Sequence, residues 1–166
     1  GGNIGQSFAA QVTAEQYDWY VLEISSFMLD DMYDFKADIA VLLNITPDHL
    51  DRYDYNLANY AASKMRIIQN QTDEDVFIYC ADDEETINAL TGIKINARQY
   101  PFSILKEIEV GASLAGENIH INTPPKAQLT MSIAELALQG KHNIYNSMAS
   151  GIVAKVLELR NDTIRE

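Results

Sequence analysis

Short apolar runs alternate with helical patterns in the first half of the chain. The runs are continuous rather than alternating, which is typical of strands that are covered on both faces, as in parallel sheets; they span residues 18–24, 38–45 and 75–80. Helical spacing of apolar positions over residues 56–70 and 82–90 predicts two helices, the second capped by Asp82 or Asp83. The pattern predicts an α/β fold with a doubly wound, mostly parallel sheet, right-handed crossovers and helices on both faces.

The second half of the chain has a different pattern. Short strands are predicted over residues 93–103, 113–115 and 118–122, with a hairpin turn at Gly116-Glu117. Residues 127–138 form a further extended stretch, and a final helix is predicted from Gly140 to about Leu159, before a polar tail. The apolar face of that helix comprises Tyr145, Met148, Ala149, Ile152, Val156 and Leu159. We therefore expect a small antiparallel β-hairpin region beside the parallel sheet.

Composition indicates an ordinary globular chain. Its 166 residues, 47% hydrophobic and 22% charged, suit a single domain over residues 1–166. Twelve basic and 24 acidic residues give a net charge of −12, which argues against binding nucleic acid or an anionic membrane through a basic surface. No apolar run is long enough to span a bilayer. The single cysteine, Cys80, fits a reducing compartment, so we expect a cytoplasmic protein and a core role for this thiol.

The chain opens inside a glycine-rich turn, Gly1-Gly2-Asn3-Ile4-Gly5, without an initiator methionine or the features of a signal peptide. We expect a piece of a longer protein; the alternative is a processed mature chain. The turn permits close backbone approach to a ligand, but it matches neither a Walker loop nor a dinucleotide fingerprint.

Two predicted strands end in polar clusters, at the edge where open α/β sheets bind ligands. Glu23 follows the first apolar run and is expected to be partly buried, either as a metal ligand or satisfied by backbone amides. The second cluster, Asn44 to Arg52, includes Asp48, His49 and Asp51. These groups could hold Mg²⁺ and a phosphate. Alternatively, Asp48 caps the next turn and Asp51 pairs with Arg52.

Lys64 stands in the apolar stripe of the helix predicted over residues 56–70. A lysine facing a core must reach solvent, pair with a carboxylate or lose its charge. A neutral lysine at the ligand-binding edge could be carbamylated, which would replace a cation with a carboxylate. At the last helix, Asn143 and Asn146 could read an adenine edge, although Asn143 could simply be the N-cap. His120, in an alternating strand pattern, is expected to be structural.

Five segments together resemble the central, ATP-binding domain of the Mur ligases, the ATP-dependent amino-acid ligases of peptidoglycan synthesis. They follow the family's order over nearly the whole chain, and are Gly1-Gly2-Asn3-Ile4-Gly5, Leu22-Glu23-Ile24-Ser25-Ser26-Phe27, Asn44-Ile45-Thr46-Pro47-Asp48-His49-Leu50-Asp51-Arg52, Tyr60-Ala61-Ala62-Ser63-Lys64 and Gly140-Lys141-His142-Asn143-Ile144-Tyr145-Asn146. The first two segments resemble the family member that adds D-glutamate to UDP-N-acetylmuramoyl-L-alanine.

The resemblance implies a role for each of these residues. Catalysis would depend on Lys64 and His49. The metal ligands for Mg²⁺ would be Glu23, His49 and carbamylated Lys64, and the substrate-binding residues would be Asn3, Ser25 and His49. ATP would be bound by Asn143 and Asn146, with Asn146 the better candidate for the adenine. The substrate carboxylate would attack the γ-phosphate of ATP to give an acyl phosphate, from which the amine of D-glutamate would displace phosphate.

Two departures from the family pattern qualify this expectation. The family usually has Gln where this chain has Met28, which removes a polar substrate contact. The family's Gly-Lys-Thr phosphate loop would lie upstream of Gly1, and its N-terminal UDP-binding and C-terminal domains would lie outside the chain. We therefore expect no ligase activity and weak ATP binding from residues 1–166 alone. The resemblance implies that the parent enzyme is a monomer.

Three other interpretations remain open at this point. The chain could come from a different Mur or folylpolyglutamate-type ligase, although Glu23-Ile24-Ser25-Ser26-Phe27 argues against it. It could be a non-catalytic binding domain that keeps the fold. A response-regulator-like domain is a weaker fit, because the first strand has no acidic pair and the region after Ile93 is rich in hairpins.

Overall fold

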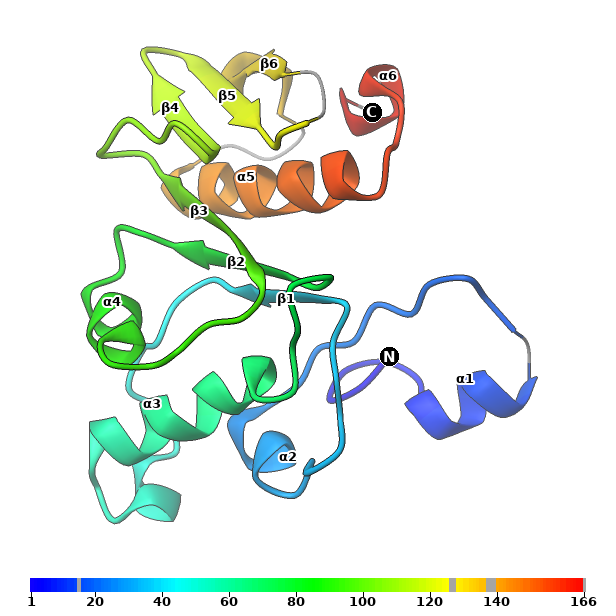
Figure 1. Cartoon of the computed structure of the whole chain (residues 1–166), viewed down its shortest axis with the longest axis vertical. Helices are drawn as coiled ribbons and strands as arrows, with labels where there is room; N and C mark the ends of the chain where they lie inside the picture. Colours follow the sequence, from blue (N-terminus) through cyan, green and yellow to red (C-terminus); the bar gives the residue numbers. More distant parts are fainter. Residues whose placement is uncertain (15, 126–127, 137–139, 166) are drawn as a thin grey trace.

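A computed structural model describes residues 1–14, 16–125, 128–136 and 140–165 (Figure 1). Six strands of the described chain form one sheet in sequence order: β1 Ile39–Leu42, β2 Val76–Cys80, β3 Arg98–Ser103, β4 Gly111–Ala115, β5 Asn118–Asn122 and β6 Leu129–Ser132. Strands β1 to β4 pair in parallel, and β4, β5 and β6 pair antiparallel. The sheet confirms the predicted parallel part and the hairpin region, including the turn at Gly116-Glu117.

Helices cover both faces of the sheet, as the sequence predicts (Figure 1). The described α-helices are α1 Phe8–Ala14, α2 Ser26–Asp30, α3 Leu57–Met65, α4 Glu84–Leu90, α5 Lys141–Val156 and α6 Asn161–Arg165. Short 3₁₀ turns are η1 Leu50–Tyr53, η2 Arg66–Ile68 and η3 Ile133–Glu135. Helix α5 packs on one face against β2 to β5, and α3 and α4 pack on the other.

The core under α5 follows from strand alternation. Ile119 and Ile121 of β5 point towards Met148 and Ile152 of α5, and all four are at most 1% exposed. Helix α5 approaches β5 closely at Gly151, where an added Cβ would lie 2.4 Å from the Ile121 Cδ1. Phe102 of β3 is fully buried in the same cluster. Cys80 is also buried there, as expected.

The opposite face is covered by α3. Asn56 caps this helix, because its side chain accepts a hydrogen bond from the Ala58 N–H at 2.9 Å. Tyr60 and Met65 then pack over Leu42 and the fully buried Phe77 of the sheet. The predicted helical stripe is therefore confirmed, with the last turn tightened into η2.

A regular set of hydrogen bonds, which we call the carbonyl ladder, fastens α3 and η2 to the segment that begins at α2. Each of four side chains donates to the carbonyl 37 residues earlier: Ser63 to Ser26, Arg66 to Leu29, Gln69 to Met32 and Asn70 to Tyr33. The constant offset means that two stretches of chain run alongside one another in register. The ladder therefore fixes α2 relative to the helix that carries Lys64.

The strand predicted over residues 18–24 does not form. Glu23 makes a single bridge to Gly2, and Val21 is 87% exposed. The apolar run has no neighbouring strand among the described residues, so its side chains have no sheet face to pack against.

Other boundaries also differ from the pattern. The strand predicted from Ile93 begins at Arg98, and the last helix ends at Val156, before α6. Within the stretch predicted over 127–138, the structure has β6 and η3. Residues 126–127 and 137–139 lie outside the described residues.

Candidate active site

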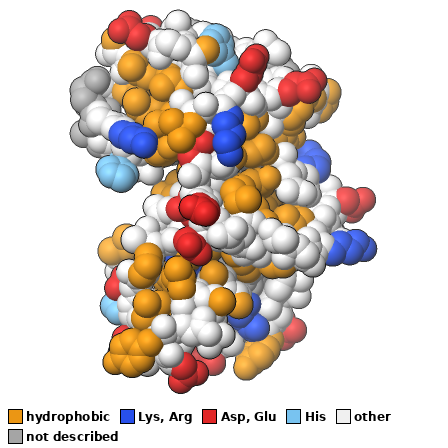
Figure 2. All heavy atoms as spheres, turned by 90° about the vertical axis from the view of Figure 1, so that its left-hand side faces the viewer, with side chains coloured by type: hydrophobic (Ala, Val, Ile, Leu, Met, Phe, Trp, Pro, Cys, Tyr) orange, Lys and Arg blue, Asp and Glu red, His pale blue; other side chains and the backbone are white. Residues whose placement is uncertain are grey.

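The carboxyl ends of β1 and β2 point to the same side of the molecule, on the left of Figure 1. Figure 2 views this side and shows Asp and Glu side chains near its narrow middle. The polar cluster from Asn44 to Arg52 follows β1 and therefore begins at the edge that binds ligands in open α/β sheets.

The loop after β1 presents His49 to solvent. Its backbone is left-handed, with φ of 48°, and the Asp48 carboxylate accepts its N–H at 2.9 Å. The N-cap of the turn that follows, η1, is His49, and no side chain caps this turn, so the alternative that Asp48 caps it is wrong. The imidazole lies 3.5 Å from the same carboxylate, is 58% exposed, and meets the Phe27 ring edge-on at 6.2 Å. Arg52 places its guanidinium over the same ring, 4.8 Å from the centroid. The loop is thus held against α2.

Lys64 is half-buried against the ring of Tyr60, with its Nζ 5.2 Å from the centroid. Burial lowers the pKa of this amine, and the charges of Glu23 and Asp48 oppose that shift. The structure therefore brings Lys64 into the electrostatic field of two carboxylates from different segments. A larger neutral fraction of the amine favours reaction with CO₂, since only the unprotonated form is nucleophilic.

Glu23 is exposed, so the expectation of partial burial is wrong. The reason is the missing strand: backbone pairing with Gly2 holds Glu23 at the surface. Its carbonyl accepts the N–H of Asn3 at 2.8 Å, which places these two candidate residues side by side. Only glycine fits at position 2, because φ is +96° and a Cβ would lie 2.2 Å from the Glu23 carbonyl oxygen.

Ser25 precedes α2, and its Oγ is buried with no hydrogen-bond partner. The next residue, Ser26, has its carbonyl bonded to Ser63, the neighbour of Lys64. A buried hydroxyl without a partner is rare in native structures. A polar ligand group could satisfy it, which agrees with the predicted substrate-binding role.

Asn143 and Asn146 lie in the first turns of α5, the former half-buried and the latter exposed. The N-cap is Gly140, so the alternative that Asn143 caps the helix is wrong. Glycine stands there because its φ is +108°, a conformation that L-residues rarely adopt.

Asp82 and Asp83, which follow β2, each accept hydrogen bonds from more than one segment of the chain. The sequence predicted only a helix cap at one of them. Asp82 accepts hydrogen bonds from Ser103 Oγ at 2.5 Å, Ile104 N–H at 2.8 Å and Tyr145 Oη at 2.9 Å. Asp83 caps α4 through Thr86 and also accepts the Ile45 N–H at 3.0 Å. The sequence signal was an acidic pair shortly after a buried strand. Tyr145 was assigned only to an apolar face, because a periodicity argument does not register its hydroxyl.

Few described side chains lie in a position to bind Mg²⁺. Within residues 1–14, 16–125, 128–136 and 140–165, no three or more His, Cys, Asp or Glu side chains cluster closely enough to hold a metal ion. Lys64 with Glu23 and Asp48 nearby is the strongest partial set, provided that carbamylation converts the amine into an oxygen donor. Mg²⁺ keeps several waters and binds through one or two carboxylates plus phosphate oxygens, so a partial protein set fits this ion.

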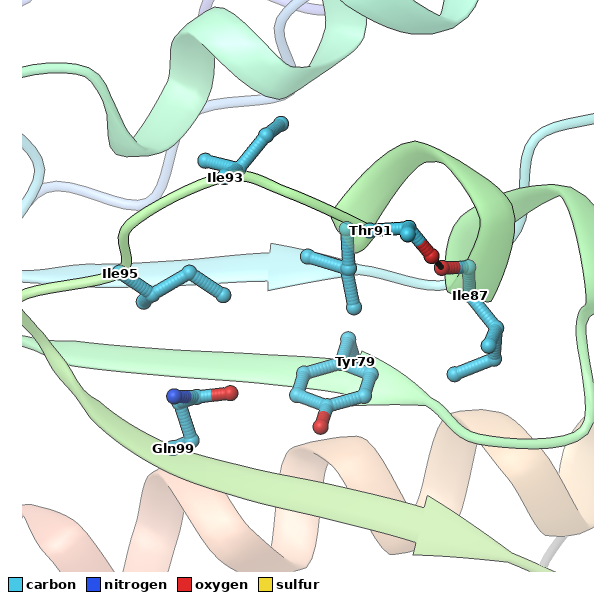
Figure 3. Close-up of a pocket in the computed structure, with 7 residues that line it drawn as sticks. Tyr79, Ile87, Thr91, Ile93, Ile95 and Gln99 are labelled. Atoms are coloured by element: carbon cyan, nitrogen blue, oxygen red, sulfur yellow. Dashed lines mark hydrogen bonds between the residues drawn. The ribbon is translucent and has the colours of Figure 1, made fainter.

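Two pockets lie away from the predicted site residues. One, of about 350 Å³, lies between the sheet and the chain after α4, and is lined by Tyr79, Ile87, Leu90, Thr91, Ile93, Ile95 and Gln99 (Figure 3). The other, of about 670 Å³, lies between the hairpin strands and residues 105–109. In the part of the chain that the structure describes, no helix is long and apolar enough to cross a membrane.

Comparison with known proteins decides between the remaining families. The sequence profile described as the Mur ligase middle domain matches residues 4–154. The chain belongs to the Mur ligase middle-domain family. Among relatives of this Mur ligase domain, the UDP-N-acetylmuramoylalanine–D-glutamate ligase of Christiangramia forsetii is 54% identical over 166 residues. The protein of the same name from Bacteroides fragilis is 49% identical over 165 residues.

These two alignments include 100% and 99% of this chain, but only 37% of the length of each relative. Solved structures support the fold. The MurF ligase of Thermotoga maritima in complex with ADP gives a TM-score of 0.56 at 14% identity, over 86% of this chain and 35% of that one. MurF from Acinetobacter baumannii gives 0.54 at 20% identity, over 78% and 28%.

Proposed function

We propose that this domain serves an ATP-dependent ligase that joins D-glutamate to UDP-N-acetylmuramoyl-L-alanine in peptidoglycan synthesis. The observation that carries the proposal is the 54% identity, over the whole chain, to a protein named UDP-N-acetylmuramoylalanine–D-glutamate ligase. The proposal includes a monomeric, cytoplasmic parent protein in which this domain lies between a UDP-binding domain and a C-terminal domain, with a phosphate loop preceding Gly1. The chain's share of its relatives, 37%, leaves room for such domains.

The metal-binding role in this proposal falls to Glu23, His49 and Lys64. Their support is the electrostatic contact of Lys64 with Glu23, and the placement of the His49 loop against α2. Lys64, carbamylated on its half-buried amine, would supply oxygen donors in place of a cation. Bound Mg²⁺ would offset the negative charge on the phosphoryl group during transfer.

Substrate and nucleotide would approach the strand ends from two sides. Asn3, Ser25 and His49 would bind the muramoyl-alanine end, and the buried, unpartnered Ser25 Oγ is the group with most to gain from a ligand. Asn143 and Asn146 would bind ATP, with their amides donating to and accepting from the adenine edge. Met28 cannot supply the amide contact that a Gln would make there.

The chemistry then needs positioning more than covalent participation by the protein. The carboxylate of the substrate attacks the γ-phosphorus of ATP, ADP leaves, and an acyl phosphate forms. The amine of D-glutamate attacks the acyl carbon, phosphate leaves, and an amide bond results. Lys64 and His49 would contribute by holding Mg²⁺ close to the phosphoryl group that is transferred.

Steady-state kinetics of the full-length protein test the proposal. We expect ADP release that depends on both D-glutamate and UDP-N-acetylmuramoyl-L-alanine, and a loss of about 100-fold or more in kcat for Lys64→Met. Lys94→Met is the matched control, because Lys94 is an exposed lysine in the chain after α4. Turnover with a different amino acid would move the assignment to another Mur or folylpolyglutamate-type ligase. No nucleotide turnover at all would favour a binding domain.

The isolated chain gives a second test. Residues 1–166 alone are expected to release no ADP and to bind ATP weakly, since the backbone donors of a phosphate loop are not among them. D-glutamate-dependent ADP release by this chain would overturn that expectation.

A further inference from the structure

Asp82 and Asp83 are consecutive residues that follow β2 after Ala81, and their carboxylates hold different parts of the domain. One bonds to the helix that carries Asn143 and Asn146, and the other bonds to the loop that carries Asp48 and His49. The pair therefore connects the helix of the residues assigned to ATP with the loop of His49, one of the three residues that the proposed function assigns to the metal.

The Asp82 arm reaches α5 through Tyr145. The tyrosine hydroxyl donates to Asp82 Oδ2 at 2.9 Å, and its ring packs against Phe102 with centroids 6.1 Å apart. The same carboxylate accepts from Ser103 and Ile104, so β3 and α5 share one acceptor. Burial opposes ionisation, but these hydrogen bonds outweigh it and hold the pKa of Asp82 below its ordinary value. The Tyr145 pKa is raised, first by burial and then by this carboxylate, so the hydroxyl remains a donor.

The Asp83 arm reaches the loop after β1. Asp83 Oδ2 accepts the Ile45 N–H at 3.0 Å, and the same oxygen accepts the Thr86 N–H at 2.9 Å and the Thr86 hydroxyl at 2.6 Å. Ile45 is 2% exposed, so the loop leaves the core at this point. Three and four residues later the chain presents Asp48 and His49 to solvent.

We infer that Asp82 and Asp83 are positioning residues that set the adenine-side helix and the metal-side loop separately, one carboxylate for each. The inference rests on the proposed function, since it assigns the two arms to ATP and Mg²⁺. Tyr145 lies between Asn143 and Asn146 in sequence, so its hydroxyl fixes the rotation of the turn that presents those amides.

The two arms have different expected kinetic signatures in the full-length ligase. Tyr145→Phe and Asp82→Asn should raise the KM for ATP about fivefold to tenfold with kcat nearly unchanged, as expected for a lost hydrogen bond to a charged group. They should also lower the preference for ATP over inosine triphosphate, because the latter lacks the adenine amino group that a well-placed amide would read. Asp83→Ala should instead raise the Mg²⁺ concentration for half-maximal rate and lower kcat, with the nucleotide preference unchanged.

Matched controls separate positioning from general damage. Tyr79→Phe removes the hydroxyl of another half-buried tyrosine, on β2, and should leave the nucleotide preference as in the wild type. Thr86→Val removes one hydrogen bond to Asp83 but leaves the Ile45 contact, so it should change the Mg²⁺ requirement less than Asp83→Ala. Tyr145→Phe and Asp82→Asn combined should be less than additive in their effect on KM, because the first removes and the second weakens the same hydrogen bond.

The outcomes that overturn the inference are distinct from failure of the proposed function. Wild-type protein without ATP-dependent, D-glutamate-dependent turnover would refute both. With an active wild type, an unchanged nucleotide preference in Tyr145→Phe would refute the Asp82 arm, and equal Mg²⁺ requirements in Asp83→Ala and Thr86→Val would refute the Asp83 arm. Tyr145→Phe loses a single oxygen atom, so it carries the test even if Asp82→Asn does not fold.

Discussion

Residues 1–24 and the sheet with α5 are packed in very different ways. No residue of α1 is buried, and Trp19 and Val21 are 54% and 87% exposed. In the sheet, by contrast, Phe77 and Phe102 are fully buried. The apolar side chains of the first region stay largely or partly exposed, whereas the sheet has helices over both faces.

The difference matters because the proposed site draws on both regions. Asn3 and Glu23 belong to the loosely packed region, and Lys64, His49 and Asn143 to segments anchored on the sheet. Regions with few buried apolar contacts open at low free energy. We therefore expect the ligand-binding edge to be rigid on its α3 and α5 sides and easily rearranged on its N-terminal side.

The largest test of this comparison is truncation of a core aromatic residue. Phe102→Ala should lower the free energy of unfolding by about 3–5 kcal/mol, because it leaves a cavity between β3 and α5. Phe8→Ala, at a position that is 38% exposed, should lower it by less than about 1 kcal/mol. Urea unfolding followed by far-ultraviolet circular dichroism measures both. Similar losses for the two variants would remove the distinction.

The ion pair at the start of β2 gives an intermediate effect with a defined pH range. Lys36 Nζ lies 2.8 Å from Asp75, which is 3% exposed and also accepts from Thr72. Burial raises the pKa of Asp75, but the bonds from Lys36 and Thr72 outweigh it and leave the pKa below its ordinary 3.8. The stabilisation is therefore present above that value and disappears as the pH falls through the lowered pKa.

For this reason Asp75→Ala should lower the free energy of unfolding by about 1–3 kcal/mol at neutral pH. The difference from wild type should shrink progressively below pH 3.8, where the wild-type carboxylate also loses its charge. Unfolding curves at several acidic pH values measure this trend. A difference that stays constant with pH would show that packing, and not charge, is responsible.

A smaller and more local effect is expected at the bridge between Gly2 and Glu23. Gly2→Ala places a Cβ against the Glu23 carbonyl at a positive φ, so the bridge should break while the sheet remains intact. Hydrogen exchange should accelerate at the amides of Asn3 and Glu23 and stay unchanged in β2. Faster exchange in β2 as well would show that the two regions unfold together.

The smallest effect concerns the single tryptophan, Trp19, which lies in the loosely packed region. Its fluorescence should change at lower urea concentration than circular dichroism does, since two probes coincide only when the whole chain unfolds in one step. In the same spirit, Val21→Ser should change the free energy of unfolding by no more than about 0.5 kcal/mol. Coincident transitions of the two probes would contradict the comparison.

Sequence periodicity predicted the helices and strands best where the signal lies within one short segment. The stripe that predicted α3, the buried run of β2 and the Gly116-Glu117 turn are confirmed, because each is encoded by neighbouring residues. The run of β1 forms a strand, but only one of its faces is buried, and Val41 is 39% exposed. The run over residues 18–24 looked the same locally, but forming a strand requires a partner, which the pattern of one segment does not contain. For the same reason Glu23 was expected to be partly buried and is exposed.

The site shows a similar division. The candidates at strand ends and the anomaly at Lys64 were visible from residue type and position. The link between Asp82 and Tyr145, 63 residues apart, depends on how α5 crosses the sheet, and no local pattern predicts it. The carbonyl ladder could not be predicted either, because the sequence of a helix does not specify which backbone carbonyls its polar side chains will bond.

The carbonyl ladder has a mechanical consequence. Each of the four hydrogen bonds joins residues that are 37 positions apart. The segment that begins with α3 therefore cannot slide along the segment from Ser26 to Tyr33 without breaking all four bonds. The two segments therefore move together, and the chain that connects them carries β1 and His49. Because Tyr33 is bonded to Asn70 in this set, we expect a spectroscopic label at position 33 to report motion of α3 from outside the site.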